Sequence, residues 1–229
     1  NGSLYLGGVS GEKVSTVPLP SEKITGLVIA DLDRDDHYEA IAAAGRNMVF
    51  ARFAGTVSDA RAGMRASPGE LPPESVTRVI LAEDPIGEPV VADIDLDGYP
   101  EVLQCTATKI YAFRAKGAPA SGFPRSLPSG DPTERIISQP IAADLDSDGL
   151  PDIAYVTSNQ RLIAHNAAGR QAEGFPLALT GPVSGSPVVI PGRDSGNGSL
   201  AWTDTTGNLY MADLPASIDN RASAWPMWR

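Results

Sequence analysis

Acidic side chains alternate with other residues in three short segments of the chain. In each segment Asp stands at positions 1, 3 and 5 of a nine-residue motif, and a further acidic residue stands at position 9. The three sets are Asp31, Asp33, Asp35 and Glu39; Asp93, Asp95, Asp97 and Glu101; and Asp144, Asp146, Asp148 and Asp152. Ca²⁺ binds about six to eight oxygen atoms, and alternating carboxylates in a tight loop supply them. The spacing therefore predicts a calcium site in each segment, called here loops 1, 2 and 3.

Backbone atoms are expected to complete each site. Loops of this kind also present the backbone carbonyl oxygen of position 7 to the ion. The residues at position 7 are His37, Tyr99 and Leu150. Position 6 must turn sharply, and Gly98 and Gly149 adopt a positive φ without strain. Loop 1 has Asp36 at this position, and since Asp tolerates the left-handed region we expect that site to survive with a less ideal turn.

Neither an EF-hand nor a purely structural role fits the loops well. An EF-hand loop has about twelve residues, ends on a bidentate Glu and lies between helices. These motifs close at position 9 and are flanked by β-rich segments bounded by Pro. A purely structural role is disfavoured because four carboxylates so close together repel one another when no cation is present.

The loops belong to a repeat, and the repeat predicts the fold. Similar apolar segments precede all three loops, and the intervals from Asp31 to Asp93 and from Asp93 to Asp144 are 62 and 51 residues. A fourth copy of the preceding segment, Ser186–Ile190, leads into residues 191–196, where the alternating carboxylates are lost, so a blade without a metal is predicted there. Each unit contains about four short strands separated by turns, which is typical of one blade of a β-propeller.

We therefore predict an all-β chain that forms a single β-propeller domain over residues 1–229, with four-stranded antiparallel blades. The predicted boundaries are a partial blade at 1–23, blades at about 24–85, 86–136 and 137–183, and a last partial blade at 184–229. This blade number is low for a closed ring of about four to eight blades. The prediction is an incomplete ring, or a fragment of a longer propeller that further segments or other chains complete.

Charge and composition exclude several classes of partner. The formal net charge is −10, and the basic residues do not cluster, so binding to nucleic acid is not expected. Three divalent cations would neutralise much of this charge at the acidic loops. The sequence contains neither an apolar run long enough to span a membrane nor the pattern of a signal peptide.

The repeats resemble the FG-GAP/VCBS family of β-propeller repeats, which includes the propeller of integrin α subunits. The most specific shared element is Asp-x-Asp-x-Asp-Gly-x-x-Asp/Glu, intact in loops 2 and 3 and with one substitution in loop 1. The resemblance implies bound calcium that stiffens the blades, an extracellular or cell-surface location, and adhesion or display of a protein or glycan ligand. The Gly-Ala-Pro landmark of the integrin version occurs only once, at 117–119, so secreted bacterial surface proteins are the nearer likeness.

Catalysis is not predicted, and two alternatives remain open. Only two histidines are present, and no sequence typical of a serine nucleophile, a zinc protease or a phosphate-binding loop occurs. A binding or adhesion module is ranked first. A structural subunit of a surface assembly is ranked second, and a calcium-dependent polysaccharide lyase domain third.

Overall fold

The computed structural model describes residues 3–7, 13–20, 23–56, 76–190 and 198–214. Within these ranges the chain is almost entirely β-strand, and its one helical element is a single 3₁₀ turn, η2, at Ala115–Gly117. The strands are β1 Ser3–Gly7, β2 Lys13–Pro18, β3 Ile24–Ala30, β4 His37–Ala44, β5 Asn47–Thr56, β6 Val76–Ile80, β7 Pro85–Ala92, β8 Glu101–Thr106, β9 Lys109–Phe113, β10 Arg125–Ser126, β11 Ile141–Ala143, β12 Asp152–Val156, β13 Arg161–His165, β14 Leu177–Ala178, β15 Val183–Ile190, β16 Ser199–Asp204 and β17 Leu209–Asp213.

These strands form five antiparallel sheets, each made of strands that follow one another in the chain. The orders are β1-β2, β3-β4-β5-β6, β7-β8-β9-β10, β11-β12-β13-β14 and β15-β16-β17. Three sheets are therefore four-stranded meanders, as the repeat predicted. The all-β prediction is confirmed for the described residues, and none of their helical segments has the length and apolar character needed to cross a membrane.

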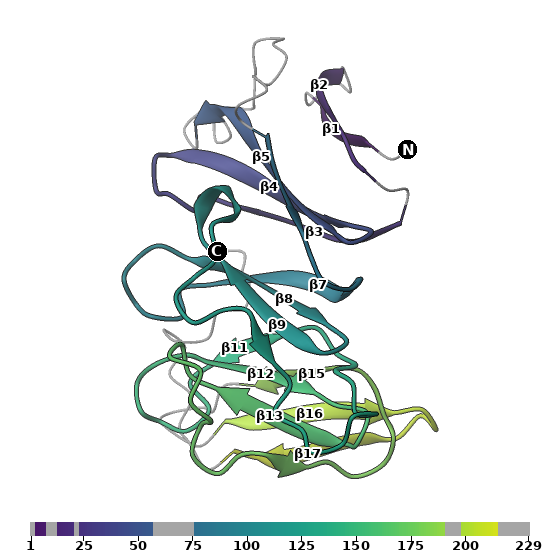
Figure 1. Cartoon of the computed structure of the whole chain (residues 1–229). Coiled ribbons are helices and arrows are strands. Elements are labelled where there is room, and N and C mark those ends of the chain that lie inside the picture. Colours follow the sequence, from purple (N-terminus) through teal and green to yellow (C-terminus); the bar gives the residue numbers. More distant parts are fainter. Residues whose placement is uncertain (1–2, 8–12, 21–22, 57–75, 191–197, 215–229) are drawn as a thin grey trace.

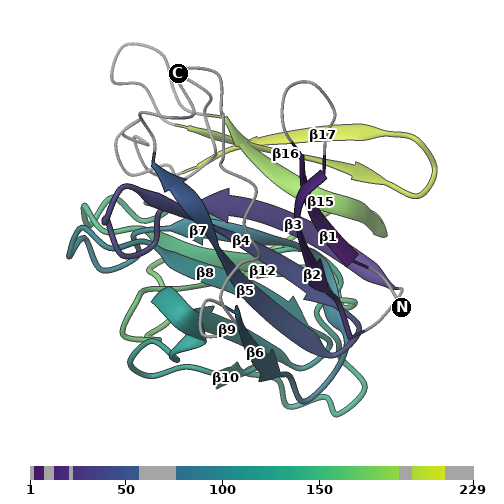
Figure 2. The same ribbon diagram turned by 90° about the horizontal axis from the view of Figure 1, so that it is seen from above.

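Consecutive sheets pack face to face in chain order (Figure 1). The first strands of neighbouring sheets touch, with β3 against β7, β7 against β11 and β11 against β15. This is how the innermost strands of propeller blades are placed around a common axis. Figure 2 views the same stack from above and shows the middle sheets lying over one another. The β1–β2 hairpin and the β15–β17 sheet lie at opposite ends, so the described sheets do not close into a ring.

The core consists of apolar layers between the sheets, and it explains why the middle strands are apolar on both faces. In β8, Val102 packs against the sheet before it, whereas Leu103 and Cys105 pack against the sheet after it. In β12, Tyr155 faces the preceding sheet and Val156 faces the following one. All six residues of β8 and all five of β12 are buried. Cys105, the one cysteine of the sequence, is buried in this core.

A glycine lies where two neighbouring sheets come close together. In β7 the pairing with β8 shifts register after Ile86, and Gly87 follows with φ +66°. A Cβ atom at Gly87 would lie 2.5 Å from the Cβ of Gln139, which precedes β11 in the next sheet. Gly185 occupies a comparable register shift in β15 with φ +76°, but it has no neighbouring atom within 4 Å.

Substitution of Gly87 and Gly185 by alanine distinguishes the cost of backbone strain from the cost of close packing between sheets. Gly87→Ala is expected to lower the free energy of unfolding by about 2–5 kcal/mol, from a left-handed conformation at about 1–2 kcal/mol plus an overpacked contact at about 1–3 kcal/mol. Gly185→Ala is expected to lose only the first contribution. Urea denaturation measures both variants. Equal losses would contradict the close packing of these two sheets at Gly87.

Candidate metal centres

Each acidic loop connects the first strand of a sheet to the second, and this connection brings distant positions of the motif together. Oxygen atoms of positions 1, 3 and 9 lie within 4.8 Å of one another in all three loops. The groups are Asp31, Asp33 and Glu39; Asp93, Asp95 and Glu101; and Asp144, Asp146 and Asp152. Position 9 begins or lies within the second strand, where Glu101 and Asp152 are fully buried. The strand therefore fixes one side of each site and the loop supplies the other.

Backbone N–H groups orient the carboxylates in the same way in each loop. The N–H of position 2 donates to the carboxylate of position 9, and the N–H of position 6 donates to that of position 1. These bonds are Leu32 N to Glu39 Oε2 at 3.0 Å, Ile94 N to Glu101 Oε2 at 3.2 Å, Leu145 N to Asp152 Oδ2 at 3.0 Å, Asp36 N to Asp31 Oδ2 at 3.1 Å, Gly98 N to Asp93 Oδ2 at 2.9 Å and Gly149 N to Asp144 Oδ2 at 3.1 Å. One oxygen of each of these carboxylates is thus satisfied by the protein.

Further oxygens of the converging carboxylates are buried without a hydrogen-bond partner. The atoms are Asp33 Oδ1, Asp93 Oδ1, Glu101 Oε1, Asp144 Oδ1 and Asp152 Oδ1. Buried polar atoms are normally paired, because an unpaired one costs about 1–3 kcal/mol. Several such oxygens directed into one small space fit a hard cation that binds oxygen ligands. The converging donors are all carboxylate oxygens, which are the ligands that hard cations prefer.

Burial also raises the pKa of the innermost carboxyl groups. Desolvation raises the pKa of Glu101 to about 7, and the charge of Asp95 adds to the effect. The pKa of Asp152 is raised to about 7 for the same reason, with Asp146 and Asp148 contributing. The pKa of Asp144 is raised as well, mainly by burial. A bound cation would favour the charged form of all these groups.

Positions 5 and 7 are placed differently from the converging groups. The position 5 carboxylates are exposed and accept hydrogen bonds from the N–H of position 7, at 2.8 Å both from Tyr99 to Asp97 and from Leu150 to Asp148. Tyr99 and Leu150 have exposed side chains, so their carbonyl groups are the atoms left to serve the site. Ligation by positions 5 and 7 stays a prediction, as does the fourth, metal-free loop, because residues 191–196 lie outside the described part of the chain.

The turn at position 6 has the predicted conformation. Gly98 has φ +93° and Gly149 has φ +86°. Asp36 also lies in the left-handed region, at φ +63°, so loop 1 makes the same turn with a non-glycine residue. The imidazole of His37 contacts the backbone oxygen of Asp35 at 3.0 Å.

The comparisons with known proteins agree with this geometry. Residues 93–155, which run from the first Asp of loop 2 through loop 3 into β12, match the FG-GAP-like repeat family. The chain contains an FG-GAP-like repeat. No curated protein matches the chain in sequence.

Three solved structures resemble the chain at low sequence identity. BBS1N, in its complex with ARL6DN, has a TM-score of 0.59 at 13% identity over 88% of this chain and 57% of that chain. The V. cholerae biofilm matrix protein Bap1 has a TM-score of 0.48 at 16% identity over 89% and 31%. BamB from Moraxella catarrhalis has a TM-score of 0.48 at 15% identity over 97% and 69%. The prediction of a propeller-type fold is confirmed by the likeness to BBS1N, of which this chain spans about 57%.

The structure adds two arginines that the sequence pattern did not single out. In loop 2 of the FG-GAP-like repeat, Arg114 Nη2 lies 2.7 Å from Asp95 Oδ2 and Arg114 Nη1 lies 2.9 Å from Asp97 Oδ2. Arg52 similarly contacts Asp35 in loop 1. The signal in the sequence was an arginine 21 residues after the first Asp of loops 1 and 2. The hairpin between the second and third strands brings each arginine beside the carboxylates of its loop, which the spacing alone does not reveal.

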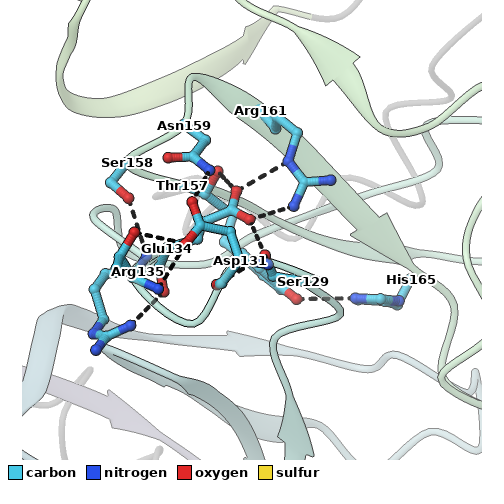
Figure 3. A network of polar contacts seen from close by, with 11 residues as sticks. Ser129, Asp131, Glu134, Arg135, Thr157, Ser158, Asn159, Arg161 and His165 are labelled. Carbon is cyan, nitrogen blue, oxygen red and sulfur yellow. Dashed lines mark hydrogen bonds and ion pairs between the residues drawn. The ribbon is translucent and has the colours of Figure 1, made fainter.

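A second acidic network surrounds Glu134 near the turn between β12 and β13 (Figure 3). Glu134 is buried and accepts from Arg161 Nε at 2.9 Å, and it also contacts Thr157 and Ser129. Burial alone would raise the pKa of Glu134, but the hydrogen bonds from these partners hold it below its ordinary value. Glu83, ten residues before loop 2 as Glu134 is before loop 3, accepts from Thr108 N at 2.9 Å. These glutamates stabilise the hairpin turns, and their carboxylate oxygens already accept hydrogen bonds from the protein.

The raised pKa values predict how stability varies with pH in the absence of divalent cations. A folded-state pKa of about 7 for Glu101 and Asp152 means that the folded chain keeps protons which the unfolded chain releases near pH 4. In a chelator, the free energy of unfolding should therefore fall as pH rises from about 4.5 to 7. Urea denaturation across this range measures the effect. Asp152→Asn should flatten the decline, and stability that rises throughout the range would contradict the assignment.

Proposed function

We propose that this chain is a calcium-binding β-propeller module that acts outside the cell by binding a protein or glycan ligand, and that the described sheets are its blades with the boundaries predicted above. The observation that carries the proposal is the convergence of three carboxylates in each of three repeated loops, with buried oxygens that have no hydrogen-bond partner, one in loop 1 and two each in loops 2 and 3. Three copies of one arrangement at equivalent places in three sheets favour a common ligand over chance clustering of acids.

Calcium fits the loops better than other biological cations. All the converging ligands are carboxylate oxygens, which are hard donors. Mg²⁺ demands a small octahedral shell and usually keeps several waters, whereas Ca²⁺ accepts irregular shells of carboxylates and carbonyls. Of the predicted ligands, Asp93, Asp95, Asp97, the Tyr99 carbonyl and Glu101 would hold the ion in loop 2. The ion would supply charge neutralisation and cross-linking.

The location of the loops supports a stiffening role. Positions 1 and 3 follow the first strand of a sheet, and position 9 lies at the start of the second. An ion shared by these positions ties two strands together at one end of the blade. For a module outside the cell, where calcium is abundant, we expect an affinity on the order of 10⁻⁴ to 10⁻³ M.

A binding role is favoured over catalysis by the state of the remaining titratable groups. His165 is buried, and its Nε2 lies 2.9 Å from the Tyr155 hydroxyl. Burial lowers the pKa of His165, so it is held neutral inside the blade. Glu134 has its oxygens paired with Arg161, Thr157 and Ser129. Protein binding by a similar fold is illustrated by BBS1N in its complex with ARL6DN, which supports a protein as the ligand class.

Calcium is expected to raise the melting temperature of the chain. At a concentration of 100 times Kd, each site adds about 2.7 kcal/mol to the free energy of unfolding by mass action. A chain of this size gains about 2–4 °C per kcal/mol, so even one occupied site predicts a rise of about 5 °C or more. Differential scanning calorimetry with excess calcium and with a chelator measures the shift.

The control separates ion binding from general charge effects. Asp93→Asn combined with Asp144→Asn removes position 1 of loops 2 and 3 and should abolish most of the calcium-dependent rise. Glu88→Gln removes one negative charge from an exposed position on β7 and should leave the rise intact. Equal melting temperatures of the unaltered chain in calcium and in chelator would defeat the proposal, as would full stabilisation of the double variant.

A further inference from the structure

We infer that Arg52 and Arg114 are affinity-determining residues that weaken calcium binding in loops 1 and 2, and that loop 3, with Asn166 at the equivalent position, is the tight site. This rests on the proposed function and goes beyond it by ranking the three sites. It also names the side chains responsible.

The strand register makes the three residues equivalent. Glu39 in β4 pairs directly with Arg52 in β5. Val102 pairs with Phe113, so the next pair along the hairpin is Glu101 with Arg114. Ile153 pairs with His165, which places Asn166 beside Asp152. The residue paired with position 9 is therefore Arg52 in loop 1, Arg114 in loop 2 and Asn166 in loop 3.

In loop 2 the guanidinium occupies oxygens that an ion would use. Asp95 Oδ1 accepts from the Asp97 N–H at 3.3 Å and Asp97 Oδ1 accepts from the Tyr99 N–H at 2.8 Å, so each keeps Oδ2 for another partner. Both Oδ2 atoms bind Arg114, at 2.7 and 2.9 Å. Arg114 Nε also lies 3.5 Å from Glu101 Oε1. One side chain thus spans positions 3, 5 and 9.

Loop 1 repeats this arrangement in a looser form. Arg52 contacts Asp35 Oδ2 directly, and its Nη1 lies 3.8 Å from Asp33 Oδ2. The arginine again spans positions 3 and 5. Its contact with position 3 is longer than the corresponding contact of Arg114 in loop 2.

Loop 3 has no such cation among the described residues. The side-chain oxygen of Asn166 accepts from the Arg170 N–H at 3.0 Å and is turned to its own loop. Asp146 Oδ2 accepts a hydrogen bond from the Glu173 N–H at 2.9 Å. Because this donor is neutral, it does not offset the negative charge of Asp146. In the described ranges, no Lys or Arg forms an ion pair with the four carboxylates of loop 3. Asp144 and Asp152 each keep one buried oxygen without a partner.

The charge difference sets the expected order of affinity. Loop 3 offers four carboxylates to a cation, whereas in loops 1 and 2 a bound guanidinium already offsets one charge. A calcium ion entering loop 2 must also displace the two hydrogen bonds of Arg114 or share the carboxylates with it. Since ligand charge tunes calcium affinity, removing the arginine should tighten binding by about three- to tenfold.

A reciprocal exchange tests the inference in backgrounds with a single working loop. Asp31→Asn with Asp144→Asn leaves loop 2, and adding Arg114→Asn should lower its Kd for Ca²⁺ about three- to tenfold. Asp31→Asn with Asp93→Asn leaves loop 3, and adding Asn166→Arg should raise its Kd by a similar factor. Loop 3 should bind more tightly than loop 2 before either exchange. Isothermal titration calorimetry with calcium chloride measures each Kd, and circular dichroism confirms the fold.

Two further variants keep the result interpretable. Arg114→Gln removes the same charge while keeping a longer side chain, and it should match Arg114→Asn if the charge is what matters. Arg170→Asn removes an exposed arginine near loop 3 whose side chain does not contact the carboxylates, and it should change the Kd of loop 3 less than twofold. Calcium binding with equal affinity in both backgrounds and no response to the exchange would overturn the inference alone. Absence of binding in both backgrounds would overturn the proposed function as well.

Discussion

The anchoring of each loop through its second residue is the contact on which the rest of the structure depends. Leu32, Ile94 and Leu145 are buried in the layers between sheets, with 1%, 2% and 0% of their surface exposed. The N–H of each donates to the position 9 carboxylate. With position 2 fixed in the core, the carboxylates of positions 1 and 3 on either side of it lie within 4.8 Å of each other and of position 9. Hydrophobic burial therefore stabilises a cluster of like charges that would otherwise separate.

In the β11–β14 sheet, the buried acidic side chains at the two ends are stabilised in different ways. At the turn between the second and third strands, Glu134 receives hydrogen bonds from a cation and hydroxyl groups, and its charge is fully compensated. At the loop end, Asp144 and Asp152 keep oxygens that no protein group satisfies. A complete polar network stabilises a fold, whereas an incomplete one with consistent geometry points to a missing ligand. Because of this contrast, a binding role is assigned to the acidic loops and not to the network around Glu134.

The repeats are alike in backbone and unlike in electrostatics. All three loops share the left-handed turn at position 6 and the N–H bonds to positions 1 and 9. The position 5 N–H differs, since it donates to position 1 in loop 1 and to position 3 in loops 2 and 3. The side chain opposite position 9 distinguishes the loops by charge, since Arg52 and Arg114 carry a positive charge and Asn166 does not. Position 9 itself varies in parallel, with Glu opposite each arginine and the shorter Asp152 opposite Asn166. A single fold can therefore hold sites of graded affinity.

The amino-acid sequence by itself determined the all-β class, the repeated unit, the three acidic loops and the turn at position 6. These features are local: nine consecutive residues contain the whole motif, and the conformation of Gly98 follows from its own backbone. The tertiary structure decided which oxygens are buried and which cations neutralise them. Arg114 reaches Asp95 only because β8 and β9 pair in one register, and Glu134 meets Arg161 across 27 residues of chain. Such contacts depend on strand register and sheet packing, which no local pattern of residue types encodes.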